Sequence, residues 1–253
     1  MDVERLASQR MLRIFLFSIL FIILISSIDP IAVLILGKPF FGDIEYRIIG
    51  GELVRVYSLS PTGFITLLLI QNIGIILIAL KVLGINQFIS LFPRERADVF
   101  KRIFILSLFF ALMAHLISIT YSMLVSLLQE YTGFELYYTK ILGKQIYLAL
   151  KLGPLFWFLT FLSVGILAPV AEELIFRWSL FGLLRLRGKN FNYAAMLSAL
   201  IFSMFHFDLL YVPIVFILGF ILAYLYEKFG NIVVPILCHC FVNMISLLIL
   251  IFI

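Results

Sequence analysis

The polar residues with the most chemical potential lie in the last hundred residues of the 253-residue chain, inside long apolar runs. Glu172 and Glu173 are adjacent, and Arg177 follows the second glutamate by four residues. On an α-helix Glu173 and Arg177 share a face and can form an ion pair, whereas Glu172 points about 100° away and has no local partner. A carboxylate that lacks a counter-charge in a medium of low dielectric is suited to accept and release a proton near neutral pH. A structural salt bridge would need only one of the two glutamates, so the pair indicates proton-transfer chemistry.

Two of the three histidines also lie inside apolar runs. His206 ends the sequence Phe-Ser-Met-Phe-His, and His239 precedes Asn243 by four residues, so that these two side chains share a helix face. Together with Glu172 they supply what amide hydrolysis needs: a base for water, donors for the developing oxyanion and a proton for the leaving amine. The third histidine, His115, is predicted to be a helix-packing residue.

The composition says which elements must position these groups. Hydrophobic residues make up 64% of the chain and charged residues 13%, against about 45–50% and about 25% in soluble domains. So few charges cannot cover a water-facing surface, which excludes a soluble globule, a disordered chain, a disulfide-stapled secreted module and a nucleic-acid-binding domain. The net charge of +5 is attributed to Lys and Arg at the ends of membrane spans. The chain has two cysteines, Cys238 and Cys240, which are too few and too close together to form a stabilising disulfide framework.

The apolar runs predict an all-α, polytopic integral membrane helical bundle of seven to eight transmembrane helices. The runs are long and lack the alternation of a membrane β-barrel. The predicted spans are about 12–36, 62–83, 103–128, 152–184, 192–207, 213–226 and 232–253. We expect one integral membrane domain over residues 1–253, with N-terminal helices and loops in 1–150 and the catalytic motifs in about 154–253. The stretches 37–61 and 86–102 are predicted to be polar loops, and the first run to be retained rather than cleaved as a signal peptide.

Charge and spacing give the expected orientation and depth. Placing the N-terminus in the cytoplasm puts about twice as many Lys and Arg on the cytoplasmic side as on the other. Counting about 1.5 Å per residue from the turns that follow Arg185 and Glu227, we expect Glu172, His206 and Asn243 to lie at nearly one depth. His239 is expected one helical turn away from them.

The order of three motifs resembles that of the CAAX protease and bacteriocin-processing family, which includes the Ras-converting type II CAAX prenyl endopeptidase. The motifs are Glu-Glu-x-x-x-Arg at 172–177, Phe-x-x-x-His at 202–206 and His-x-x-x-Asn at 239–243. The resemblance covers about 154–253. It implies an intramembrane, glutamate-dependent endopeptidase built as a helical bundle, usually of about eight helices, which is one more than the runs predicted here.

The resemblance also implies a role for each matching residue. Glu172 is the general base that activates a water molecule, and His206 assists it. His239 and Asn243 form the oxyanion hole. The remaining positions are supporting ones, Glu173 and Arg177. No cofactor and no metal are implied.

Three other functions compete with this interpretation. A zinc-dependent membrane peptidase would also use Glu and His, but the chain lacks His-Glu-x-x-His and Asn243 is a poor zinc ligand. A transporter would also carry intramembrane Glu, Arg and His, although no inverted repeat is visible. The third alternative is a non-proteolytic membrane protein similar to bacteriocin-immunity proteins.

The expected partners follow from the favoured interpretation. The substrate would be a membrane-anchored peptide or a prenylated protein with a C-terminal CAAX sequence, met in the lipid bilayer, and no nucleic acid is expected. The chain would be a multi-pass protein of the cell membrane in a prokaryote, or of the endoplasmic reticulum membrane in a eukaryote.

Overall fold

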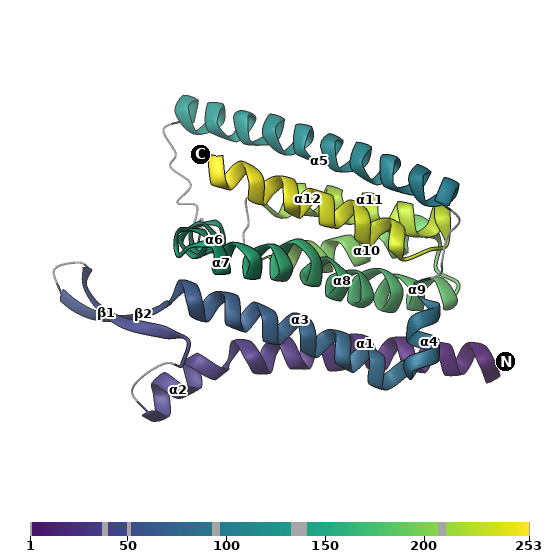
Figure 1. Cartoon of the computed structure of the whole chain (residues 1–253), viewed down its shortest axis with the longest axis horizontal. Helices are drawn as coiled ribbons and strands as arrows, with labels where there is room; N and C mark the ends of the chain where they lie inside the picture. The colour runs from purple at the N-terminus through teal and green to yellow at the C-terminus, as the bar shows by residue number, and fades with distance from the viewer. Residues whose placement is uncertain are drawn as a thin grey trace.

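The computed structural model describes residues 2–36, 40–49, 52–92, 97–132, 141–206 and 211–252. Helices dominate this part of the chain (Figure 1). The elements, in chain order, are α1 (Asp2–Ser26), α2 (Ile28–Leu36), β1 (Gly42–Ile49), β2 (Glu52–Leu59), α3 (Pro61–Leu83), α4 (Ile85–Ser90), α5 (Ala97–Thr132), α6 (Ile141–Lys151), α7 (Pro154–Thr160), the π-helical segment η1 (Phe161–Leu167), α8 (Ala168–Glu173), the π-helical segment η2 (Leu174–Phe181), α9 (Gly182–Leu186), α10 (Phe191–Met204), α11 (Val212–Phe229) and α12 (Val233–Phe252).

Six helical segments within the described residues are long and apolar enough to cross a membrane. They are Glu4–Val33, Pro61–Leu83, Asp98–Leu127, Pro154–Leu186, Val212–Phe229 and Val233–Ile251, and a shorter apolar helix covers Phe191–Met204. Each of the seven predicted runs corresponds to one of these segments. The predictions of a polytopic helical bundle and of a multi-pass integral membrane protein are therefore confirmed.

The region 37–61, expected to be a polar loop, contains a β-hairpin. Strands β1 and β2 pair antiparallel, with Gly42 opposite Leu59 and Ile49 opposite Glu52. Both strands are rich in β-branched and aromatic residues, which favour extended backbone. The hairpin connects α2 to α3, and its base is tied to α2 because the Asp29 carboxylate accepts hydrogen bonds from the backbone N–H groups of Phe40 and Phe41.

Two other connections are more helical than predicted. Helix α4 and the first turn of α5 fall within the expected loop 86–102, and the 11-residue helix α6 lies outside the seven predicted runs. These short helices add to the bundle without adding a long apolar span.

The bundle encloses the helix that carries both glutamates. Figure 1 shows α1 and α3 on one side of the segment α7–α9, and α12, α11 and α5 on the other. Packing contacts join α3 to η1 and α8, α1 to η2, and α12 to η1, α8 and α5, while α10 packs on η2 and α11. Residues 154–186 therefore have helices on several sides, which removes their polar side chains from lipid.

Gly153 and Pro169 act differently on the fourth predicted run. Gly153 has a φ of 116°, a conformation that favours glycine, and it separates α6 from α7. Pro169 instead lies inside a continuous helical segment, next to the π-helical turns of η1. The chain accommodates this proline by a change of hydrogen-bond register.

Candidate active site

The helix α8, which carries Glu172 and Glu173, lies between two π-helical segments. At the end of η1 the Ala168 N–H donates to the Ser163 carbonyl, five residues back, as a π-helix requires. In this register the next donor would be residue 169 and its acceptor Val164. Because residue 169 is proline and has no N–H, the Val164 carbonyl needs another donor.

Side chains from two other helices bond to these carbonyls. Asn243, on α12, donates its side-chain Nδ2 to the Val164 carbonyl at 2.8 Å. Asn72, on α3, donates Nδ2 to the Ser163 carbonyl at 3.2 Å. The carbonyls of Ser163 and Val164, which precede Pro169, therefore accept hydrogen bonds from helices on two sides of the segment α7–α9.

Glu173 and Arg177 form the predicted ion pair. Arg177 Nε lies 3.1 Å from Glu173 Oε2, and both side chains are fully buried. The Arg177 guanidinium also donates Nη2 to the Gly219 carbonyl at 3.2 Å and lies 4.5 Å from the centre of the Phe202 ring. An arginine buried this deeply needs these several partners, because a lone buried charge is costly.

His239 lies between the two glutamates. Its Nδ1 is 2.9 Å from Glu173 Oε1 and its Nε2 is 3.6 Å from Glu172 Oε2. An ionised carboxylate only accepts hydrogen bonds, so Nδ1 carries the hydrogen that is shared with Glu173. The distance to Glu172 is too long for a direct hydrogen bond. It leaves Glu172 in electrostatic contact with the ring but not bonded to it.

Exposure distinguishes the two glutamates. The side chain of Glu172 is 28% exposed, whereas that of Glu173 is 0% exposed. Glu172 is therefore partly exposed, although its Oε2, the oxygen that faces His239, is buried, whereas Glu173 is enclosed against Arg177 and His239. This difference agrees with the directions predicted for the two side chains, which point about 100° apart around the helix.

His206 joins the cluster through an aromatic side chain. Its Nδ1 lies 3.1 Å from the Phe202 carbonyl, which can only accept, so Nδ1 carries the hydrogen. In the neutral ring Nε2 then has the lone pair and can act as a base. The His206 and Phe202 ring centres are 5.0 Å apart, in an edge-on arrangement.

Phe202 is a site residue whose role the sequence analysis missed. Its ring contacts the Arg177 guanidinium, His206 and His239, with the His239 ring centre 5.7 Å away. It is 1% exposed. Its sequence signal was present as the first residue of Phe-x-x-x-His, but only the packing shows that one ring supports three polar groups. Asn72 was also missed, although a lone Asn inside an apolar span was a visible signal.

The predicted depths need one correction. His239, rather than Asn243, lies level with Glu172, since its ring contacts both glutamates. Asn243 is one helical turn further along α12, where it bonds to Val164, eight residues before Glu172. The predicted depths assumed a uniform rise of about 1.5 Å per residue. The π-helical turns change this rise, and the lengths of the side chains shift the depth of their polar atoms.

The cluster combines two carboxylates, Glu172 and Glu173, with one guanidinium, Arg177, and two imidazole rings, His206 and His239. Carboxylates and imidazoles are the side chains that most often act as general acids and bases.

The predicted packing role of His115 is supported by its contacts. Its Nδ1 bonds to the Ala111 carbonyl at 2.9 Å and its Nε2 to Ser246 Oγ at 3.1 Å, which joins α5 to α12. Within the described residues, no three His, Cys, Asp or Glu side chains are grouped as metal ligands.

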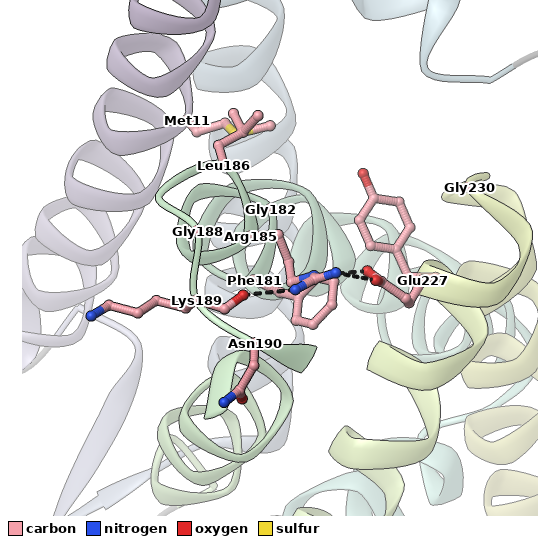
Figure 2. Close-up of a pocket in the computed structure, with 11 residues that line it drawn as sticks. Met11, Phe181, Gly182, Arg185, Leu186, Gly188, Lys189, Asn190, Glu227 and Gly230 are labelled. Atoms are coloured by element: carbon pink, nitrogen blue, oxygen red, sulfur yellow. Dashed lines mark hydrogen bonds and ion pairs between the residues drawn. The ribbon is translucent and has the colours of Figure 1, made fainter. Parts of the chain in front are cut away.

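A surface cavity of about 490 Å³ lies away from this cluster, where the chain turns from α9 into α10 and where α11 ends. It is lined by Met11, Phe181, Arg185, Lys189, Glu227 and Gly230, among others. Figure 2 shows Arg185 facing Glu227, with its other guanidinium nitrogen directed to the Lys189 carbonyl. The ion pair confirms that the two turns lie on one side of the bundle, as the depth estimate assumed. The cavity contains none of the predicted site residues.

The fold and the enclosed Glu–His–Arg cluster define a polytopic helical membrane protein with a polar site inside its helices. Comparison with known proteins is more specific. Residues 154–245 match the family described as "Type II CAAX prenyl endopeptidase Rce1-like". All three motifs fall within this range, and the resemblance predicted from them is confirmed over this part of the chain.

Two relatives agree with this match. The chain is 38% identical over 79 residues to YdiL of Bacillus subtilis (strain 168), whose name proposes a membrane peptidase. It is 34% identical over 142 residues to the membrane-embedded CAAX protease MroQ of Staphylococcus aureus (strain USA300). These matches cover 31% and 53% of this chain, and 32% and 54% of the relatives. No solved structure gives a significant match.

Proposed function

We propose that the protein is an intramembrane endopeptidase that cleaves a membrane-anchored peptide with a water molecule activated by Glu172. The observation that carries the proposal is the placement of one histidine, His239, between a sealed glutamate and an accessible one. The match of residues 154–245 to the CAAX prenyl endopeptidase family supports the same reaction class.

Glu172 is the general base in this mechanism. Part of its side chain is exposed, and we place the attacking water there, while the surrounding helices exclude bulk solvent and strengthen each electrostatic interaction. Glu172 takes a proton from the water as the oxygen attacks the peptide carbonyl carbon. That proton then passes to the amide nitrogen when the C–N bond breaks.

His206 assists this proton transfer. The Phe202 carbonyl orients its ring, which leaves Nε2 as the base in the neutral form. A second base in the same cluster lets one group accept a proton from water while the other delivers a proton to the leaving amine.

His239 and Asn243 are the proposed donors to the developing oxyanion. Asn243 Nδ2 carries two hydrogens, of which one is used on Val164. His239 presents Nε2 on the side of Glu172, and it donates from this atom when both ring nitrogens carry a hydrogen. Both donors are fixed by other bonds, which avoids reorganisation when the oxyanion forms.

Glu173 and Arg177 have a supporting role. Glu173 holds His239 Nδ1 at 2.9 Å, and Arg177 balances the charge of Glu173. This pair fixes the direction in which His239 presents its other nitrogen, as carboxylates orient histidines in other hydrolytic sites.

The bilayer and the matched family support the substrate class that we propose. A peptide held at the membrane by a lipid or by its own helix would reach a site enclosed by spans. We propose a C-terminal CAAX peptide carrying a prenyl chain as the substrate to test first, because the matched family is described by that activity. We also propose that residues 1–253 act as one membrane domain, with 154–253 carrying the chemistry.

The test is cleavage of a membrane-anchored fluorescent peptide by protein purified in detergent and returned to liposomes. The prenylated CAAX peptide is compared with the same peptide anchored by a transmembrane helix. The variants are Glu172→Gln and His206→Ala, with Glu227→Gln as a matched control because Glu227 lies on the surface, away from the cluster. Size-exclusion chromatography and thermal unfolding confirm folding.

We expect Glu172→Gln and His206→Ala to abolish cleavage and Glu227→Gln to retain it. Cleavage of the prenylated peptide alone would support CAAX specificity, and cleavage of both would indicate recognition of any membrane anchor. Undiminished cleavage in both folded site variants would refute the mechanism.

A further inference from the structure

We infer that Asn72, on α3, is a positioning residue for this site, because it holds η1 in the π-helical register that turns Glu172 and Glu173 toward α12. Its link to catalysis rests on the proposed function. Its effect on the helix register does not, and can be measured separately.

The burial of Asn72 requires an explanation. The residue lies in the middle of an apolar span and is 2% exposed. A polar side chain in such a place is costly unless it is hydrogen-bonded. Asn72 Nδ2 donates a hydrogen bond to the carbonyl of Ser163, a residue whose side chain is also fully buried.

The Ser163 carbonyl accepts hydrogen bonds at the place where the segment α7–α9 leaves the π-helical register. It accepts both from Asn72 and from the Ala168 N–H, which is the π-type bond directly before Pro169. The following carbonyl, Val164, lies where the proline has removed a donor, and Asn243 bonds to it. The two asparagines thus act on adjacent carbonyls from opposite neighbours, α3 and α12.

Side chains also donate hydrogen bonds to backbone carbonyls in the second π-helical segment, η2. Ser198, on α10, donates to the Phe176 carbonyl of η2 at 2.8 Å, and Ser179 donates to the Leu174 carbonyl at 2.7 Å. Polar side chains therefore bond to backbone carbonyls in both irregular stretches of this helix. A π-helix is rare because its backbone bonding is poor, and such extra donors offset that cost.

The register of η1 decides which way the glutamates point. A change of one residue in helical register rotates everything after it by about 100°. Glu172 and Glu173 follow η1 directly, so relaxation of η1 toward an α-helix would turn them away from His239. The present contacts of 2.9 and 3.6 Å leave no room for such a rotation.

The test compares Asn72→Leu, which keeps the branched shape and removes the donor, with Asn72→Gln, which keeps an amide. Gln71→Leu is the matched control, because it removes the adjacent amide from the same span but on another face of α3. The purified, liposome-reconstituted enzyme is assayed for kcat and KM, and its thermal unfolding is recorded.

We expect Asn72→Leu to lower kcat by about 5- to 150-fold, the range set by one lost buried hydrogen bond, with KM unchanged. Asn72→Gln recovers part of the activity, and Gln71→Leu behaves as wild type. A purely structural role would instead lower the unfolding temperature and leave kcat of the folded enzyme unchanged. That result would overturn the positioning role.

A second measurement does not need proteolysis. The unfolding temperatures of Asn72→Leu, Pro169→Ala and the double variant form a cycle, since Pro169 creates the bonding defect beside which Asn72 acts. We expect the two effects to be non-additive, and additive effects would overturn the inference. If the wild-type protein cleaves no peptide but the cycle is non-additive, the proposed function fails and the structural part of the inference stands.

Discussion

Replacing Arg177 by methionine tests the electrostatic logic of the whole cluster. Arg177 and Glu173 are both fully buried, and their charged atoms are 3.1 Å apart. Methionine has a similar length and no charge, so Arg177→Met leaves Glu173 with His239 as its remaining partner among the contacts described above. Breaking a buried pair in this way costs about 3–5 kcal/mol, because one charge is left uncompensated.

We expect the lower end of that range, about 3 kcal/mol, because the hydrogen bond from His239 Nδ1 still stabilises the Glu173 carboxylate. This corresponds to roughly two powers of ten in the unfolding equilibrium. The matched control is Arg185→Met, which breaks an ion pair with Glu227. Those side chains are 35% and 36% exposed, and such a pair contributes about 0–1 kcal/mol.

The assay is equilibrium unfolding in mixed detergent micelles, followed by tryptophan fluorescence. Adding Glu173→Gln to Arg177→Met should recover stability, since the uncompensated charge is then removed. The reasoning is refuted if Arg177→Met costs no more than Arg185→Met, or if the double variant is less stable than Arg177→Met alone.

Three further predictions concern packing and metal dependence. Phe202→Leu should reduce cleavage and destabilise the protein by about 1–3 kcal/mol, because the ring that supports Arg177, His206 and His239 is lost; retained kcat in the folded variant would argue against this support. Gly219→Ala should destabilise by about 1–3 kcal/mol, since the new Cβ would lie 3.0 Å from the Phe202 ring and 3.1 Å from Ala199. In Gly165→Ala the nearest atom belongs to the flexible Met244 side chain, at 3.3 Å, so this substitution should cost less, and thermal unfolding of the two variants makes the comparison. A membrane-permeant zinc chelator should leave cleavage unchanged, because Glu173 bonds to one ring nitrogen of His239 and Glu172 faces the other, so the three side chains do not converge on one point; loss of activity that zinc restores would favour the zinc-dependent alternative.

Composition and motif order were sufficient for the class of protein and for the identity of the polar cluster. Long apolar runs predict the helical, membrane-spanning fold, because only helices and closed β-barrels satisfy their backbone hydrogen bonds in lipid and these runs are too long and lack the alternation of barrel strands. The i,i+4 spacing of Glu173 and Arg177 determined their ion pair, since it holds on any helix. The hairpin at 42–59 escaped prediction because its alternating pattern is short and lies between stronger apolar signals.

The tertiary structure decided which histidine meets which glutamate. Spacing along the chain set the depth of His239 and Asn243 only to within about one turn, and the π-helical turns around α8 changed both the rise and the rotation of the glutamates. The roles of Phe202 and Asn72 were likewise undetermined by sequence, because each acts on residues of other helices. Local patterns specify what a segment forms, whereas the contacts between segments depend on how the whole bundle packs.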